Sequence, residues 1–524
     1  GKNMAVQTFA AITVGSFELE LGIYELSARN GLRRVDEVRH VIGLGKDTYS
    51  TGKISYELVE ELCRVLEDFV KIMNTYKVTD YRAYGTSAMR EAKNKQIILD
   101  QIRVRTGLNI RVISNSEQRL ISYKGIASKA AEFNRIIQEG AAILDMGYGS
   151  AQISLFDKDA LVTTQNLPLG ALRIRSLLER IPATAQLHRQ QIEEIVDNEL
   201  FTFRKMYLKD RQITNLIGIG DNILYLLRQI GQRVSGDCLE ASVLMKFYDL
   251  FTGMTLDQIE ERFGVTAEYA SLLLPAVVVY KRVMEITGAK LFWLPGIRLC
   301  DGIAAEYGQE KKLLKLGHNF ENDIVAASRN MAKRYKCHQT HNQYLEQYAG
   351  AIFDSIKKYH GLSSRDRLLL QIAVILHACG KFISMRNSNE CAYNIIMSTE
   401  IIGLSHLERE IIANVVRYNV RDFDYDRVQL AADFHPYGEP QVSQNDITIR
   451  IAKLTAILRL ANSMDRGHSG KLADCRMSVR DGELVVITGY KGDISLEAQS
   501  FAQKADFFEE IFGIRPILKQ KRRS

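Results

Sequence analysis

The sequence predicts two related α/β domains, followed by an all-helical region and a small α+β unit. A strand, a Gly-rich turn and a second strand follow one another in AAITVGSFELELGIYEL at residues 10–26 and again in AAILDMGYGSAQISLFD at residues 141–157. Because each copy continues into further strands and helices, the repeat indicates a duplicated fold with a cleft between the two Gly turns. Beyond residue 305 most segments have helical spacing until CRMSVRDGELVVITGY, near the C-terminus. We therefore expect four domains, at residues 1–130, 131–305, 306–472 and 473–524.

The composition is that of an ordinary globular chain. Of the 524 residues, 46% are hydrophobic and 25% are charged, which excludes a disordered, collagen-like or coiled-coil protein. The net charge of +7 is too mild to indicate a nucleic-acid partner. No apolar run approaches the ~20 residues that span a bilayer, and the seven Cys form no CxxC pair, as is typical of reduced thiols. We expect a soluble cytoplasmic protein that binds neither membrane nor nucleic acid.

Periodicity predicts the elements of the first domain. Phe17, Leu19 and Leu21 alternate with polar positions as in a half-buried strand, so that Glu18 and Glu20 are expected to face solvent. Apolar residues recur every three or four positions after Ser55, which indicates an amphipathic helix. The pattern predicts strands at 8–14 and 17–26, a helix at 55–73, a strand running into a helix at 81–94, a strand at 110–114 and a helix at 117–129.

The two Gly turns are the first candidates for a functional site. Backbone N–H groups in a tight turn after a strand converge on one point and bind anions, and glycine lets a phosphate approach closely. Gly15 and Ser16 form the first turn, and Gly147, Gly149 and Ser150 form the second. A plain structural turn is the alternative for either one alone. Two such turns at equivalent places of a repeat favour phosphate binding.

Two further segments carry groups that suit phosphate chemistry. Thr86, Ser87 and Arg90 lie near an expected helix start, where free N–H groups and a guanidinium both favour phosphate. The alternative for Arg90 is a surface ion pair with a neighbouring Glu. Glu117 follows the strand at 110–114 and could accept a proton from attacking water. Its alternative is a helix N-terminal Glu that only interacts with the helix dipole.

These segments together carry a family resemblance. The strings AAITVGS, YGTSAMREAKN, VISNSEQRLISYKGI, ILDMGYGSAQISLF and NLPLGALRIR stand in this order. They resemble the exopolyphosphatase and guanosine pentaphosphate phosphohydrolase (Ppx/GppA) family, whose domains have the actin/Hsp70/sugar-kinase (ribonuclease H-like) fold. LLLQIAVILHACGKFI, IIGLSHLEREIIANVVRYN and LTAILRLANSMDRGHSGK extend the resemblance over nearly the whole chain. It implies a hydrolase that removes terminal phosphate from a phosphoanhydride chain, usually with Mg²⁺, and commonly a homodimer.

The resemblance also assigns roles to individual residues. It places Gly15 and Ser16 in the first phosphate loop, and Thr86, Ser87 and Arg90 in the segment that closes on the terminal phosphate. The second loop would be Asp145, Gly147, Gly149 and Ser150, with Asp145 as the Mg²⁺ ligand. Glu117 best matches the general base, but this alignment needs a shift of one residue. A gapless alignment places Gln118 there instead, and glutamine cannot abstract a proton from water.

Several positions depart from the family pattern. The Asp that normally begins the first loop is Thr13, and the Asn after its Gly-Ser pair is Phe17. In the second loop Ala151 and Gln152 replace Thr and Glu, and the third Gly-rich strip is altered at residues 218–222. Mg²⁺ prefers carboxylate ligands, so these changes leave Asp145 as the main loop carboxylate and predict weakened Mg²⁺ binding.

Two classes of function therefore remain open. We favour hydrolysis of terminal orthophosphate from inorganic polyphosphate, with guanosine pentaphosphate (pppGpp) as the alternative substrate. In the second class the protein binds polyphosphate or pppGpp as a regulator and has lost turnover. A sugar or acetate kinase lacks support because the third Gly strip is degraded.

The helical region resembles the HD-like domain of the same family. An HD metal site needs adjacent His and Asp, but His377 precedes Ala378, while His341 and Asp465 remain. We expect a non-catalytic module in which His377 is a packed core residue. Basic residues of this region could line a channel for a polyanion, and a solvated helical surface is the equal alternative. They are Lys381, Arg386, Arg417, Arg466 and Lys471.

Overall fold

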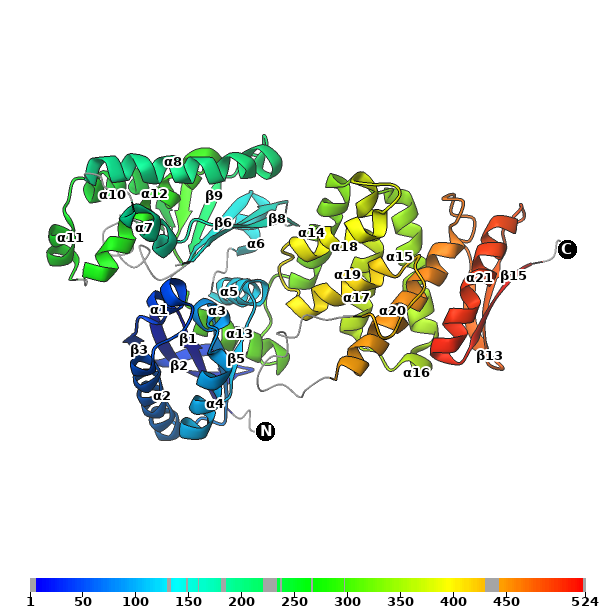
Figure 1. Ribbon diagram of the computed structural model, residues 1–524, viewed down its shortest axis with the longest axis horizontal. Helices are drawn as coiled ribbons and strands as arrows, with labels where there is room; N and C mark the ends of the chain where they lie inside the picture. The colour runs from blue at the N-terminus through cyan, green and yellow to red at the C-terminus, as the bar shows by residue number, and fades with distance from the viewer. Residues whose placement is uncertain are drawn as a thin grey trace. The chain divides into compact units, whose positions relative to one another are not determined.

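A computed structural model describes most of the chain as two compact units. Unit 1 runs to Asp323 and unit 2 begins at Ile324, and each is considered by itself (Figure 1). None of the described helices is long and apolar enough to cross a bilayer. The described residues are 6–129, 133–147, 149–158, 160–180, 185–219, 233–235, 238–264, 267–295, 297–428 and 443–521.

Unit 1 begins with a five-stranded sheet of order β3-β2-β1-β4-β5. The first three strands are antiparallel, whereas β4 and β5 continue parallel to β1. One face packs against α2, whose Leu62, Leu66 and Phe69 are fully buried or nearly so. The strands are β1 (Gln7–Val14), β2 (Glu18–Ser27), β3 (Gly31–Val41), β4 (Asp80–Gly85) and β5 (Ile110–Val112). The helices are α1 (Leu44–Thr51), α2 (Tyr56–Thr75), α3 (Ser87–Glu91), α4 (Lys95–Thr106) and α5 (Asn115–Lys129).

The second sheet of unit 1 repeats the opening hairpin. Strands β6 and β7 are antiparallel like β1 and β2, and β9 runs parallel to β6 as β4 does to β1. The sheet order is β10-β11-β12-β9-β6-β7-β8, and α8, α10 and α12 lie over one face (Figure 1). Its strands are β6 (Ala141–Met146), β7 (Ala151–Asp157), β8 (Ala160–Leu167), β9 (Asn215–Ile219), β10 (Arg233–Ser235), β11 (Cys238–Glu240) and β12 (Leu291–Trp293). Its helices are α6 (Phe133–Gln138), α7 (Ala171–Glu179), α8 (Ala185–Phe203), the π-helix η1 (Arg204–Leu208), α10 (Ser242–Thr252), α11 (Leu256–Phe263) and α12 (Ala267–Thr287).

Helix α13 (Leu299–Glu310) returns to the first sheet and fixes α5 in place. The two helices meet at Gly125 and Gly302, where a Cβ on Gly302 would lie 2.0 Å from the carbonyl oxygen of Ile121. Only glycine permits this approach. Helix α13 also covers the face of β1 and β2 that α2 leaves open.

This second cover explains one wrong prediction. Glu20 was expected to face solvent from β2 but is only 3% exposed. Alternation along a strand predicts a solvent-exposed face only where no other element packs on that face of the sheet. Here the chain returns from residue 299 onward to bury it.

Unit 2 is helical and ends in a three-stranded sheet of order β13-β14-β15. Helix α20 packs on α21, and one hydrophobic core contains Ile457, Val486 and Phe508, so the small sheet shares the core of the helices. The elements are α14 (Phe320–Arg334), whose first turn belongs to unit 1, α15 (Gln339–Ser355), α16 (Lys357–His360), α17 (Ser364–Leu376), the 3₁₀ helix η2 (Cys379–Phe382), α18 (Ser388–Ser398), α19 (His406–Arg417), α20 (Gln444–Met464), β13 (Arg476–Arg480), β14 (Glu483–Thr488), α21 (Ser495–Phe512) and β15 (Arg515–Gln520).

The predicted fold class is confirmed. Two α/β sheets with equivalent opening hairpins precede a helical region and a small C-terminal sheet. The exact domain boundaries at residues 130, 305 and 472 stay predictions.

Candidate functional site

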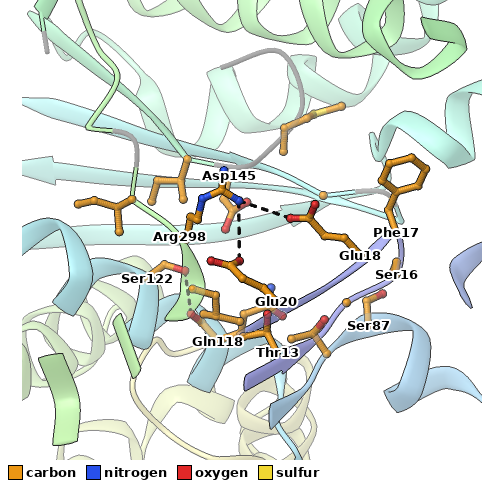
Figure 2. A pocket seen from close by; sticks show the side chains of 17 residues that line it. Thr13, Ser16, Phe17, Glu18, Glu20, Ser87, Gln118, Ser122, Asp145 and Arg298 are labelled. Carbon is orange, nitrogen blue, oxygen red and sulfur yellow. Dashed lines mark hydrogen bonds and ion pairs between the residues drawn. The ribbon is translucent and has the colours of Figure 1, made fainter. Parts of the chain in front are cut away.

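A pocket of about 150 Å³ lies between the two Gly turns of unit 1 (Figure 2). Its wall combines hydroxyl groups, two turn glycines, three carboxylates and one guanidinium. The lining residues with polar side chains are Thr13, Ser16, Glu18, Glu20, Thr86, Ser87, Gln118, Ser122, Asp145 and Arg298.

The first Gly turn is a tight backbone turn. The N–H of Gly15 donates to the carbonyl oxygen of Glu18 at 3.0 Å. Gly15, Ser16 and Thr13 all lie on the pocket wall. The turn therefore brings a glycine and two hydroxyl side chains to the same side of the cleft, as a phosphate loop requires.

The second Gly turn closes in the same way. The N–H of Gly147 donates to the carbonyl oxygen of Ser150 at 2.9 Å, and a Cβ on Gly147 would lie 2.8 Å from that oxygen. Gly147 lines the pocket, whereas Gly149 and Ser150 lie in the turn but outside the lining. From the third strip, Ile219 reaches the pocket, and residues 220–222 lie outside the described residues.

The start of α3 contributes hydroxyls, and Arg90 lies behind them. Thr86 and Ser87 line the pocket. Arg90 does not, because its guanidinium donates to the carbonyl oxygen of Ile113 at 2.8 Å, to Asn115, and to Oε1 of Gln118 at 3.2 Å. Arg90 thus holds the beginning of α5 and orients the Gln118 side chain.

Helix α5 presents Gln118, and not Glu117, to the pocket. Gln118 and Ser122, one helical turn apart, are both on the wall. The Glu117 carboxylate accepts a hydrogen bond from Arg111 at 2.5 Å and is absent from the lining. This is the arrangement that the gapless alignment predicts. The assignment of Glu117 as general base stays a prediction, and the geometry does not favour it.

Asp145 is held by a buried arginine. Arg119 of α5 donates from Nη1 to Oδ2 of Asp145 and from Nε to Oε1 of Gln152. The side chains of Arg119 and Asp145 are 7% and 12% exposed. An ion pair so buried is costly to break because it leaves an uncompensated charge.

These side chains do not fit the Mg²⁺ ion that the resemblance implies. Thr13 and Gln152 are neutral, and Asp145 already accepts from a guanidinium. Within the part of the chain that the structure describes, no group of three or more His, Cys, Asp or Glu side chains could hold a metal ion. The donor set is too poor in available carboxylate for a hard divalent cation.

Sequence reasoning missed the basic residue of the pocket and the acids around it. Arg298 lies 2.8 Å from Glu37, 3.6 Å from Glu18 and 3.9 Å from Glu20, and Figure 2 shows its guanidinium between the last two. Glu20 lies directly across from Thr13 in the β1–β2 pair. That cross-strand position was the available signal. Arg298 lies far from these residues in the sequence, and no sequence pattern indicated that it would reach the pocket.

Unit 2 contains a histidine cluster with one acid. His341 Nδ1 lies 2.6 Å from Asp465, and the rings of His341 and His468 stack at 3.7 Å. The His377 ring lies 5.7 Å from that of His341 and contacts the carbonyl oxygen of Val374 through Nδ1 at 2.6 Å. Burial lowers the pKa of His377 to about 4. His377 is a buried, neutral residue, as predicted for a core histidine.

The predicted polyanion channel stays a prediction. Arg417 pairs with Glu390 at 3.0 Å and lies over the Tyr393 ring. Lys471 donates to the carbonyl oxygen of Asp493 at 3.0 Å. Exposed positions are taken by Lys381, Arg386 and Arg466.

Comparison with known proteins identifies the family. The Ppx/GppA phosphatase family matches residues 23–295, and the Ppx/GppA phosphatase domain III matches residues 325–498. A guanosine-5'-triphosphate,3'-diphosphate pyrophosphatase of Photobacterium profundum is 20% identical over 423 residues, covering 79% of this chain and 81% of its own length. Exopolyphosphatase 1 of Mycobacterium tuberculosis is 24% identical over 164 residues, covering 31% of this chain and 46% of its own.

Solved structures agree on the fold. The crystal structure of the Aquifex aeolicus Ppx/GppA family member is similar with a TM-score of 0.50 at 21% identity, covering 59% of this chain and 99% of that one. The family patterns cover most of the chain on both sides of residue 305. The chain therefore belongs to the Ppx/GppA phosphatase family, a family of phosphoanhydride hydrolases.

Proposed function

We propose that the cleft of unit 1 binds the terminal phosphates of inorganic polyphosphate or pppGpp, and that hydrolysis of the bound chain is strongly impaired. The protein would then act as a phosphate-chain-binding member of a hydrolase family. The observation that carries this proposal is the placement of Gln118, instead of a carboxylate, where α5 meets the pocket.

Binding is supported by the donors around the pocket. The side chains of Thr13, Ser16, Thr86 and Ser87 line it, together with the two turn glycines Gly15 and Gly147. Hydroxyl and backbone N–H donors suit phosphate oxygens, and they need no metal to do so. The pocket volume of about 150 Å³ suits one or two phosphate groups.

Turnover is expected to be impaired because the part of the pocket wall that the structure describes lacks a well-placed general base. Attack of water on the terminal phosphorus requires a group that accepts the water proton, and such a base accelerates a reaction by about 10²–10⁴-fold. The amide of Gln118 is not basic enough to do this. Glu117 is paired with Arg111 and lies outside the lining residues.

A second candidate function is slow polyphosphate hydrolysis with Glu20 as the base. Glu20 supports it because its carboxylate lies on the pocket wall opposite Thr13. Its ion pair with Arg298, at 3.9 Å, opposes it, because the carboxylate already has a cationic partner.

The test combines binding with phosphate release. Calorimetry should detect long-chain polyphosphate or pppGpp binding to the wild type, and Ser87→Ala should weaken it by about tenfold, because a hydrogen bond to a charged group is lost. Ser50→Ala, the same substitution at an exposed position of α1, is the control. Absence of binding to both ligands would contradict the proposal.

Orthophosphate release separates the two functions. The wild type should release phosphate only slowly, and Glu117→Gln should not change that rate. Loss of a slow release in Glu20→Gln would support the second candidate. Fast release that Glu117→Gln abolishes would contradict the proposal and restore the predicted base.

A further inference from the structure

We propose that Arg119 takes the place of a divalent cation at Asp145, so that the cleft is closed to metal and its charge is balanced by fixed guanidinium groups. This inference goes beyond phosphate binding. It rests on the proposed function only because both concern the same cleft. It starts from the mismatch between the pocket side chains and Mg²⁺.

Arg119 contacts two side chains of the second loop. Asp145 and Gln152 are direct neighbours across the β6–β7 pair, and one guanidinium donates to both. Gln152 is 1% exposed, so its amide oxygen is directed inward to this contact. The arginine therefore engages the one carboxylate and the one amide oxygen that the second loop could offer to a cation.

The charge of Arg119 opposes the binding of a metal ion at Asp145. A divalent ion at Asp145 would have to lie beside a guanidinium or displace it. The first arrangement puts like charges together in a poorly solvated site, and the second leaves Arg119 buried without its counter-ion. Either outcome opposes metal binding.

Packing fixes the helix that carries Arg119. Helix α5 is locked against α13 where Gly125 meets Gly302, with no room for even a Cβ. On the helix, Arg119 follows Gln118, which Arg90 holds. The guanidinium is thus delivered by a fixed helix.

Glu18 and Glu20, the other two carboxylates of the pocket, also lie beside arginine side chains. Glu18 accepts from Arg39 at 2.7 Å, and Glu20 lies 3.9 Å from Arg298. Figure 2 shows Arg298 reaching toward both acids. All three carboxylates of the pocket wall are therefore matched with arginine, and a phosphate chain would meet a wall neutralised without metal.

Mn²⁺ binding to the purified protein tests this inference directly. Isothermal calorimetry with MnCl₂ alone should show no saturable site in the wild type up to about 1 mM, a range in which built divalent-cation sites bind. Arg119→Met, which keeps much of the apolar stem volume, should create one site at least about tenfold tighter. Adding Asp145→Asn to that variant should remove the site.

Two controls keep the result decisive. Arg119→Lys keeps the positive charge and should still exclude Mn²⁺, whereas Arg111→Met removes a neighbouring arginine outside the lining and should also gain no site. A wild-type Mn²⁺ site that Asp145→Asn abolishes would overturn the inference, and so would a folded Arg119→Met that gains none. If Arg119→Met shows no thermal transition and is therefore unfolded, Arg119→Lys still provides the test. Mn²⁺ binding by Arg119→Lys at a site absent from the wild type would contradict the inference. No Mn²⁺ binding by Arg119→Lys would support it. Because no phosphate chain is present, failure of the proposed function would leave these outcomes unchanged.

Discussion

The cleft of unit 1 and the histidine cluster of unit 2 bury ionisable side chains in opposite ways. In the cleft, Asp145 and Arg119 are both charged and neutralise each other. In the cluster, burial holds His377 neutral, with a pKa of about 4. The comparison teaches that a buried ionisable side chain can be accommodated in two ways: Asp145 is paired with a guanidinium, whereas His377 stays neutral.

The largest expected effect comes from breaking the charged pair. Asp145→Asn should lower the free energy of unfolding by about 3–5 kcal/mol, because Arg119 is left buried without its counter-ion. The Arg119→Met/Asp145→Asn double variant should be destabilised by less than the sum of the single variants. Urea unfolding of the four proteins measures this coupling, and strict additivity would contradict a paired site.

The next effect concerns pH and the histidine cluster. The pKa of His377 falls from 6.5 to about 4 on folding, through burial and the nearby His341, Lys381 and His468. Below pH 6.5 the unfolded chain takes up a proton that the folded chain refuses, so stability should fall as the pH drops from 6.5 toward 4. It should be fully retained above 6.5.

The expected loss is about 2–3 kcal/mol from this one group. Urea unfolding across the pH range measures it. His377→Asn, which keeps a donor for the carbonyl oxygen of Val374, should flatten the dependence. An unchanged slope in that variant would show that another group titrates.

A smaller effect compares the two Gly turns. A Cβ would lie 2.8 Å from a carbonyl oxygen at Gly147 and 3.0 Å at Gly15. Gly147→Ala should cost about 1–3 kcal/mol, and Gly15→Ala less, with weaker phosphate-chain binding in both. Gly43→Ala meets nothing within 4 Å and is the control. Thermal unfolding and calorimetry report the two effects, and equal behaviour of all three variants would contradict the crowding argument.

The smallest effect is expected at Glu117. Its pair with Arg111 is partly exposed, at 19% and 29% for the two side chains. Glu117→Gln should therefore change stability by less than about 1 kcal/mol. A larger loss in urea unfolding would indicate a structural role that the contacts do not show.

Local pattern and family resemblance predicted the architecture. The repeated hairpin motif predicted the two sheets, and the hydroxyls at Thr86 and Ser87 were expected near a phosphate and do line the pocket. These features depend on residues close together in sequence. Short-range signals are the ones that a single sequence carries best.

The rest depends on contacts between distant segments. A shift of one residue turns a helix by about 100°, so the choice between Glu117 and Gln118 needed the packed position of α5. Glu20 became a wall residue because α13 returns to cover its sheet. Arg119 and Arg298 reach partners that no periodicity links to them.

Phosphate release by Gln118→Glu tests the central claim most directly. The substitution restores a carboxylate at the position of α5 that faces the pocket. We predict that Gln118→Glu releases orthophosphate from long-chain polyphosphate or pppGpp at least about 10²-fold faster than the wild type, while Gln118→Ala and Glu117→Gln stay at the wild-type rate. A wild type that already turns over quickly, and loses that activity in Glu117→Gln while Gln118→Glu gains nothing, would contradict the account.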